Sequence, residues 1–282
     1  MDDATEDSTK SATADSTKKD SEPRLRHEFV GMMFAITIGE VGLQVAALVQ
    51  AGHTAHYLPA YTHLFLATVM IATSWVGWSV SRSPGARLDV IAIFQWEFVV
   101  LLLDVALVIT YFILVRAVDF GREGVPPRIA PPSTLAFWTI VIFALYFVWD
   151  IVTKIIIYNR KPEGQWFRKY GSRMIPTIVC LILAFVIRQK TSSADLPHYL
   201  TADFALLSLV LLFRALKDLV SACIPKKKGD AIDRSKVWWA GGWTLLCVVG
   251  LTFGLMATSW SWHLPIPDSI TREIQAPPPP GE

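Results

Sequence analysis

Long apolar runs, separated by short polar segments, make up most of the chain. Each run has about 17 to 25 residues, which is the length that an α-helix needs to cross a lipid bilayer. The pattern predicts an all-α fold, namely a polytopic transmembrane helix bundle with seven spans. The predicted spans are 28–50, 62–81, 90–114, 134–157, 173–189, 200–221 and 238–260. The fifth span is the shortest and contains Pro176 near its start, so six spans are the alternative.

Polar segments flank this apolar region on both sides. Residues 1–27 are rich in Asp, Ser, Thr and Lys, a composition typical of a disordered tail. Residues 261–282 are rich in proline, which lacks the backbone N–H that a helix uses. We therefore assign residues 28–260 to a transmembrane helical domain between a disordered N-terminal tail and a Pro-rich C-terminal tail.

The distribution of basic residues predicts how the spans are oriented. With the N-terminus inside, nineteen of the 26 Lys and Arg residues fall in cytoplasmic segments and six fall outside. Because basic residues accumulate on the cytoplasmic side, this favours a cytoplasmic N-terminus. Lys226, Lys227 and Lys228 form a basic cluster that is expected to contact anionic lipid headgroups or, alternatively, a cytosolic anionic ligand. The expected location is a cell membrane, specifically a bacterial inner membrane.

Composition agrees with this interpretation and excludes several function classes. Charged residues make up 18% of the chain, against about 25% in soluble domains. The net charge of +2 gives no basis for a nucleic-acid partner. Glycine-rich nucleotide loops and the HExxH and GxSxG motifs are absent, so no enzyme activity is expected. No histidine lies in the middle of a predicted span, and we expect no cofactor and no metal ligand set.

Acidic residues within the predicted spans are the main functional candidates. Glu40, Glu97, Asp104 and Asp150 each lie inside an apolar run. An ionisable group at the centre of a bilayer costs roughly 2.5–3.5 kcal/mol on insertion scales, so such groups usually face the protein interior. Lys154 follows Asp150 by four residues, a spacing at which two side chains meet on one helix face. These two residues are predicted to form a gate or a structural ion pair.

Helical spacing places the acids on polar stripes. Residues three, four or seven positions apart lie on the same face of a helix. Three helices that each carry such a stripe are expected to pack their stripes together, because none can face lipid cheaply. The stripes consist of Thr37, Glu40 and Gln44 on the first span, Glu97, Asp104 and Tyr111 on the third, and Thr139, Tyr146, Asp150 and Thr153 on the fourth.

Two further patterns concern the outer boundary and the contacts between helices. Five of the six histidines, His63 among them, fall on the predicted outer side. Both an ordinary interfacial position and a pH-sensing or metal site are consistent with that bias. Gly250 and Gly254 form a GxxxG pair in the last span. Such pairs let two helices approach closely, either within one chain or between the subunits of a homo-oligomer.

Two classes of function fit the sequence. In the first, the protein is a channel or transporter for protons or small cations, and Glu40, Glu97, Asp104 and Asp150 line the path. In the second, it is a non-transporting membrane sensor or scaffold in which the same acids hold helices together. A ligand-gated pore, such as a bacterial defence effector controlled through its basic cytoplasmic loops, combines the two. A hydrated path along the acids favours transport, whereas acids that are all paired favour the scaffold.

Overall fold

The computed structural model describes residues 25–50, 58–80, 96–119, 128–160, 174–191, 196–223 and 233–259. These residues form helices and one pair of two-residue antiparallel strands, in which Val118 lies opposite Ile129. The fold is therefore helical as predicted, apart from this short strand pair. The helices are α2 (Leu25–Gln50), α3 (Leu58–Val80), α4 (Trp96–Val115), α5 (Pro132–Arg160), α7 (Ile175–Lys190), α8 (Leu196–Cys223) and α9 (Arg234–Ser259), and the strands are β1 (Val118–Asp119) and β2 (Arg128–Ile129).

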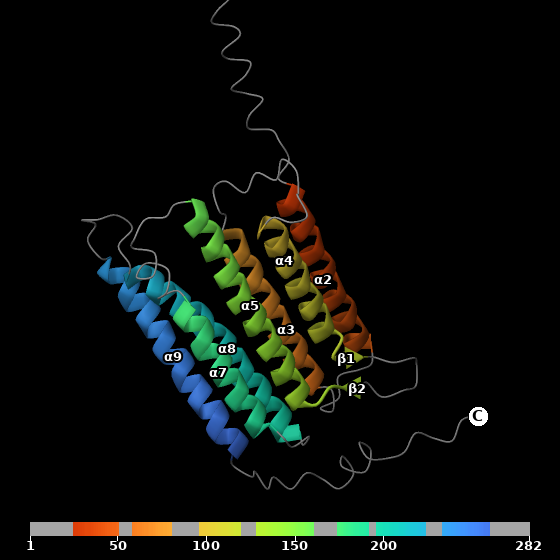
Figure 1. The fold of residues 1–282 in the computed structure, drawn as a ribbon. Coiled ribbons are helices and arrows are strands. Elements are labelled where there is room, and N and C mark those ends of the chain that lie inside the picture. Colours follow the sequence, from red (N-terminus) through yellow and green to blue (C-terminus); the bar gives the residue numbers. More distant parts are fainter. Residues whose placement is uncertain are drawn as a thin grey trace, which may run out of the picture.

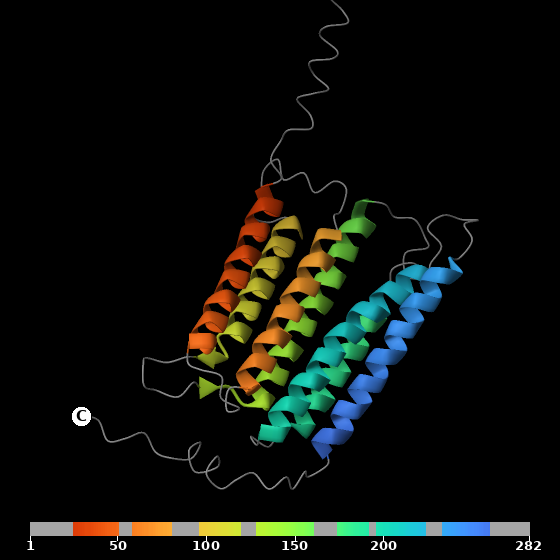
Figure 2. The ribbon, with the colours of Figure 1, turned by 180° about the vertical axis from the view of Figure 1, so that it is seen from behind.

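The helices run alternately in opposite directions along one bundle (Figure 1). Helices α4, α5 and α7 form one layer, and α3, α8 and α9 form the other. Helix α2 contacts both α3 and α4 at the edge of the two layers, as the view from behind also shows (Figure 2). The start of α2 and the end of α9 therefore lie at opposite ends, which we call the amino end and the carboxyl end of the bundle.

Six of the described helices are long and apolar enough to cross a membrane. Helix α7 has 16 residues, which gives a length of about 24 Å against a hydrocarbon core of about 30 Å. It nevertheless lies alongside α5 and α8 within the bundle (Figure 1). Six spans are therefore supported by length and composition, while a seventh crossing by α7 and a cytoplasmic N-terminus stay predictions.

Several predicted boundaries shift by a few residues. Helix α2 begins at Leu25, within the segment that was assigned to the tail, and α3 begins at Leu58 rather than at residue 62. Helix α9 begins at Arg234, four residues before the predicted start, because Asp233 caps it by accepting a hydrogen bond from the backbone N–H of Lys236. Residues 1–24 and 260–282 lie outside the described residues, so the remaining tail predictions are untested.

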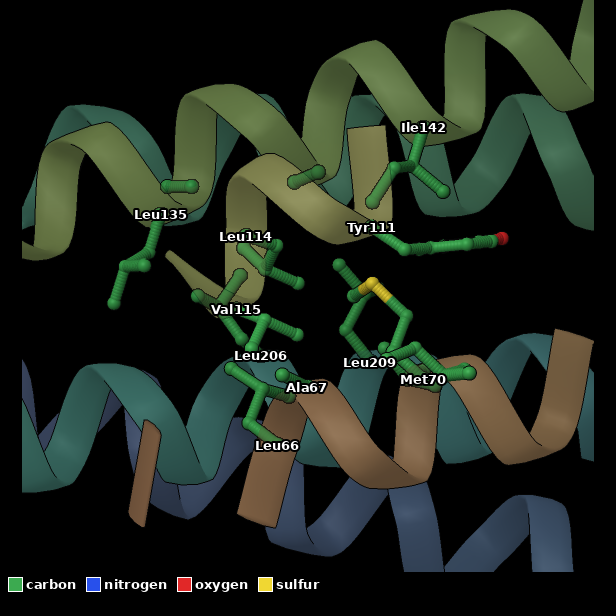
Figure 3. Packing of buried hydrophobic residues seen from close by; sticks show 14 of the residues in the cluster. Leu66, Ala67, Met70, Tyr111, Leu114, Val115, Leu135, Ile142, Leu206 and Leu209 are labelled. Atoms are coloured by element: carbon green, nitrogen blue, oxygen red, sulfur yellow. The ribbon is translucent and has the colours of Figure 1, made fainter. Parts of the chain in front are cut away.

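The described helices are apolar on their outer as well as their inner faces. Large side chains such as Ile36, Leu43 and Phe253 are each more than half exposed on the outside. Leucines, isoleucines and Met70 from α3, α4, α5 and α8 fill the interior (Figure 3). A helix that is apolar all round is typical of a membrane span, since lipid takes the place of the polar surface that water requires.

Helices α8 and α9 pack closely through the GxxxG pair. A methyl group added at Gly254 would lie 3.0 Å from Ala205 Cβ and 3.1 Å from Ala205 Cα, and one added at Gly250 would lie 3.0 Å from Ser208 Oγ. The two glycines therefore allow close contact between two helices of the same chain. This is one of the two uses expected from the sequence. A homo-oligomer stays a prediction.

Candidate functional site

Asp150 joins three helices in the half of the bundle near the amino end. Thr177 Oγ1 of α7 donates a 2.9 Å hydrogen bond to Asp150 Oδ2, and Lys217 Nζ of α8 lies 3.6 Å from the same oxygen. An unpaired buried carboxylate is costly, and the Lys217 ammonium stabilises the charge of Asp150. Lys154, the partner expected from the sequence, is buried one turn further along α5, and its pairing with Asp150 stays a prediction.

The Lys217 ammonium also lies against two aromatic rings. Its Nζ is 4.6 Å from the centroid of the Phe213 ring and 5.7 Å from that of Tyr146. Both distances allow a cation–π attraction. The side chain of Lys217 remains 29% exposed, whereas that of Asp150 is only 10% exposed. Lys217 thus connects a buried acid with the surface of the bundle.

Three hydroxyl groups meet next to this ion pair. Tyr111 of α4 donates to Ser74 Oγ of α3 at 2.7 Å, and Tyr146 of α5 lies within hydrogen-bond distance of both. The Tyr111 and Tyr146 oxygens are 2.8 Å apart. A hydroxyl both donates and accepts, so hydrogen bonds in this triad can reverse their direction without any movement of the helices.

Asp104 is the most deeply buried of the described acids on the predicted stripes. It is 3% exposed, and its Oδ1 accepts a 2.9 Å hydrogen bond from Trp149 Nε1. Asp104 lies two turns before Tyr111 on α4, and Trp149 directly precedes Asp150 on α5. We call the whole group the central polar cluster: Ser74, Asp104, Tyr111, Tyr146, Trp149, Asp150, Thr177 and Lys217.

Glu40 belongs to a separate contact between α2 and the turn after α4. Its Oε1 accepts a 2.8 Å hydrogen bond from Gln44 Nε2 and lies 2.8 Å from Arg116 Nε. The Arg116 side chain is 51% exposed and that of Glu40 is 10% exposed. The predicted stripe on α2 does face inward, and the Thr37 hydroxyl donates to the Met33 carbonyl of its own helix. The Arg116 guanidinium thus balances the charge of the Glu40 carboxylate.

A second polar group lies near the carboxyl end, and we call it the carboxyl-end cluster: Thr62, His63, Asp203 and the Leu114 carbonyl. Thr62 Oγ1 contacts Asp203 Oδ2 at 2.5 Å, and His63 Nε2 lies 3.0 Å from the Leu114 oxygen. His63 Nδ1 faces Asp203 Oδ1 at 3.9 Å. This cluster connects α3, α4 and α8.

Apolar side chains separate the two clusters. His63 and Ser74 are eleven residues apart on α3, which corresponds to about 16 Å along the helix. Between them lie Ala67 and Met70, and Leu206 and Leu209 of α8 lie beside these residues in the same part of the core (Figure 3). We call these four residues the apolar layer. Among the described residues of α3, no fully buried polar side chain lies between His63 and Ser74. Thr68 and Thr73 are half-buried there, and their hydroxyls donate to carbonyls of their own helix.

Several predicted residues cannot be placed. Glu97 is the second residue of α4, and its side chain lies outside the described residues. Lys226, Lys227 and Lys228 also lie outside them, so contact with lipid headgroups is untested. Within the described residues, no group of three His, Cys, Asp or Glu side chains could hold a metal ion.

Sequence reasoning missed the basic and hydroxyl partners of the acids. Arg116 follows the predicted span 90–114, and Lys217 lies near the end of the predicted span 200–221. Long basic side chains at such positions reach back toward buried acids. Their positions, within one or two turns of a helix end, were the available signal. Ser74 and Thr177 carried no such signal, because Ser and Thr occur throughout membrane helices.

Comparison with known proteins adds no relative. No protein-family model matches the chain, and neither a curated protein nor a solved structure matches it. The class must therefore come from the fold and the site. Six long apolar helices with lipid-compatible outer faces and polar groups turned inward are compatible with an integral, multi-pass membrane protein.

Proposed function

We propose that the protein is a channel or transporter for protons or small cations in a bacterial inner membrane, and that protons are its substrate. The observation that carries this proposal is the position of the Asp150–Lys217 ion pair, whose ammonium lies over the ring of Tyr146, beside the hydroxyl triad of Ser74, Tyr111 and Tyr146. Carboxylate, ammonium and hydroxyl groups in sequence can each accept and release a proton, which makes such a series suited to a relay.

The charge balance favours protons over metal cations. Glu40 and Asp150 already have Arg116 and Lys217 as counter-charges. A sodium or potassium ion would therefore have to displace the guanidinium or ammonium group of that side chain. A metal ion also needs several oxygen ligands around it, whereas a proton moves between two hydrogen-bonded atoms. Asp104, which is held by the Trp149 indole, supplies a further acid on the same side of the apolar layer.

The apolar layer gives the proposed path a closed state. Ala67, Met70, Leu206 and Leu209 lie between the central polar cluster and the carboxyl end. Apolar constrictions of this kind gate ion movement by excluding water. Conduction therefore requires the layer to hydrate, and we expect Met70→Ser to raise proton flux in a folded variant.

Proton flux into proteoliposomes tests the proposal, measured with an internal pH-sensitive dye under proton, sodium and potassium gradients. Tyr146→Phe keeps the ring beneath Lys217 and removes only the hydroxyl. We expect its proton flux to fall about tenfold, as when removal of one hydrogen bond raises a barrier by about 1.4 kcal/mol. The matched control is Asp218→Asn, because Asp218 is 55% exposed and pairs with Arg214 on its own helix. Equal proton flux in all three proteins would refute the proposal.

A second candidate is the non-transporting sensor or scaffold. It is favoured by one observation: each acid on the stripes whose side chain is described, namely Glu40, Asp104 and Asp150, has a polar partner in direct contact. In this case folded wild-type protein carries no flux under any of the three gradients. The ligand-gated pore predicts a third result, in which flux begins only when an anionic ligand is added on the side of Lys226, Lys227 and Lys228.

A further inference from the structure

The carboxyl-end cluster contains two buried polar atoms that face each other without a hydrogen bond. His63 Nδ1 and Asp203 Oδ1 have no hydrogen-bond partner among the described residues, and they are 3.9 Å apart. The side chains of His63 and Asp203 are 1% and 4% exposed. A buried polar atom without a partner is costly, so a native structure that retains two of them needs an explanation.

The carboxyl-end cluster has fewer hydrogen-bond donors than its acceptor atoms require. His63 Nε2 lies 3.0 Å from the Leu114 carbonyl, which can only accept, so Nε2 must carry a hydrogen. In a neutral imidazole Nδ1 then carries a lone pair and no hydrogen, although it lies 3.9 Å from a carboxylate oxygen that can only accept. Thr62 Oγ1 likewise contacts two acceptors, the Pro59 carbonyl at 3.0 Å and Asp203 Oδ2 at 2.5 Å, with one hydrogen to give.

One additional proton, held between His63 and Asp203, removes the deficit between these two side chains. On His63 Nδ1 it produces an imidazolium that faces the Asp203 carboxylate. On Asp203 it produces a neutral acid that donates to His63 Nδ1. Both forms remove the net negative charge that an ionised Asp203 beside a neutral His63 would bury. We propose that Thr62, His63 and Asp203 form a proton-binding site that couples the packing of α3, α4 and α8 to pH.

The Lys and Arg side chains of the described residues do not replace this proton. The nearest titratable side chains on α8 are His198 and Tyr199, one turn before Asp203. On the α4 side the basic residue is Arg116, which is engaged with Glu40 of α2. The acid of β1, Asp119, has a side chain outside the described residues. Among the described side chains, no Lys or Arg forms an ion pair with Asp203.

The sign of the pH dependence follows from proton counting. At neutral pH an unfolded chain has an ionised Asp and a largely neutral His, so the folded protein holds one proton more. Stability therefore falls as pH rises, by up to about tenfold in the folding equilibrium constant per pH unit. Asp203→Asn supplies the missing hydrogen from its amide and carries no charge. This variant is expected to keep its stability as pH rises.

Thermal unfolding of the full chain in detergent micelles, from about pH 6 to about pH 9, tests the site. We expect the wild-type midpoint to fall with pH by at least about 3 °C more than that of Asp203→Asn. The matched control is Asp218→Asn, which removes an exposed carboxylate from the same helix and must keep the wild-type slope. Equal slopes in wild type and Asp203→Asn would overturn the proposal.

A second measurement uses wild-type protein alone and covers the case in which Asp203→Asn does not fold. The imidazole ¹⁵N shifts of His63, assigned by comparison with His63→Gln, report where the protons are. A proton shared with Asp203 gives an Nδ1 shift that changes with pH together with the unfolding midpoint. A neutral Nε2–H imidazole with a constant shift over the whole range would overturn the proposal. So would a midpoint that follows sodium concentration rather than pH.

Discussion

Replacing Gly254 by alanine tests whether close contact between α8 and α9 stabilises the bundle. The added methyl group would lie 3.0 Å from Ala205 Cβ, 3.1 Å from its Cα and 3.3 Å from its backbone nitrogen. Carbon atoms prefer separations of about 3.5–4.0 Å, so α8 and α9 must move apart by roughly half an ångström or more. Two of these three atoms belong to the backbone, which no change of rotamer can move aside.

The magnitude follows from two opposing effects. Overpacking of a well-packed contact costs about 1–3 kcal/mol. Alanine is favoured over glycine within a helix by about 1 kcal/mol. Gly242 lies on the same helix, and a methyl group there would meet nothing within 4 Å. Gly242→Ala changes stability only through helix propensity. The difference in the free energy of unfolding between Gly242→Ala and Gly254→Ala therefore isolates the packing cost of about 1–3 kcal/mol.

Thermal unfolding in detergent micelles measures this difference, at roughly 2–4 °C per kcal/mol for a chain of this size class. We expect Gly242→Ala to be at least as stable as wild type and Gly254→Ala to be less stable. Gly250→Ala should lie between them, because its 3.0 Å neighbour is a serine hydroxyl that can rotate away. Equal midpoints for Gly254→Ala and Gly242→Ala would show that α9 does not pack on Ala205 as described.

Two smaller predictions concern ion pairs at the ends of helices. Arg116→Gln leaves the Glu40 carboxylate with Gln44 alone. We expect the free energy of unfolding to fall by about 1–2 kcal/mol, less than for a fully buried pair, because Arg116 is 51% exposed. In chemical unfolding, the double variant with Glu40→Gln should recover most of this loss. Hydrogen bonds from Lys236, first from its ammonium, lower the pKa of Asp233. The cap on α9 is therefore complete above about pH 3.9 and is lost as pH falls through the lowered folded pKa. An NMR titration should show this pKa rising toward its usual value in Lys236→Gln, and an unchanged pKa would contradict the assignment.

The inward orientation of the acids could be predicted because it depends only on spacing and solvent. Asp104 and Tyr111 are seven residues apart, and both are buried. Lipid cannot solvate a carboxylate, so any helix in a membrane turns such a stripe toward other helices. The same reasoning predicted the GxxxG contact, since two glycines four residues apart expose backbone that a neighbouring helix can approach.

The partners of the acids could not be predicted, because they depend on which helices are neighbours. Asp150 meets Thr177 of α7 and Lys217 of α8, which follow it by 27 and 67 residues. A stripe on one helix restricts the direction of its own side chains and says nothing about the register of another helix. The strand pair was missed for a related reason, since two residues are too few to establish an alternating pattern.

The distribution of polar groups along the bundle gives the transport and scaffold hypotheses different physical requirements. A scaffold needs each polar group to be satisfied where it stands, and the central polar cluster meets that requirement through Trp149, Thr177 and Lys217. The carboxyl-end cluster does not, because His63 Nδ1 and Asp203 Oδ1 remain without a hydrogen bond. In a scaffold, a site that forms all of its hydrogen bonds only after it gains a proton would lower the stability of the protein at high pH. A protein that responds to protons on one side of the apolar layer would use the same site, and for this reason we favour a proton-linked function.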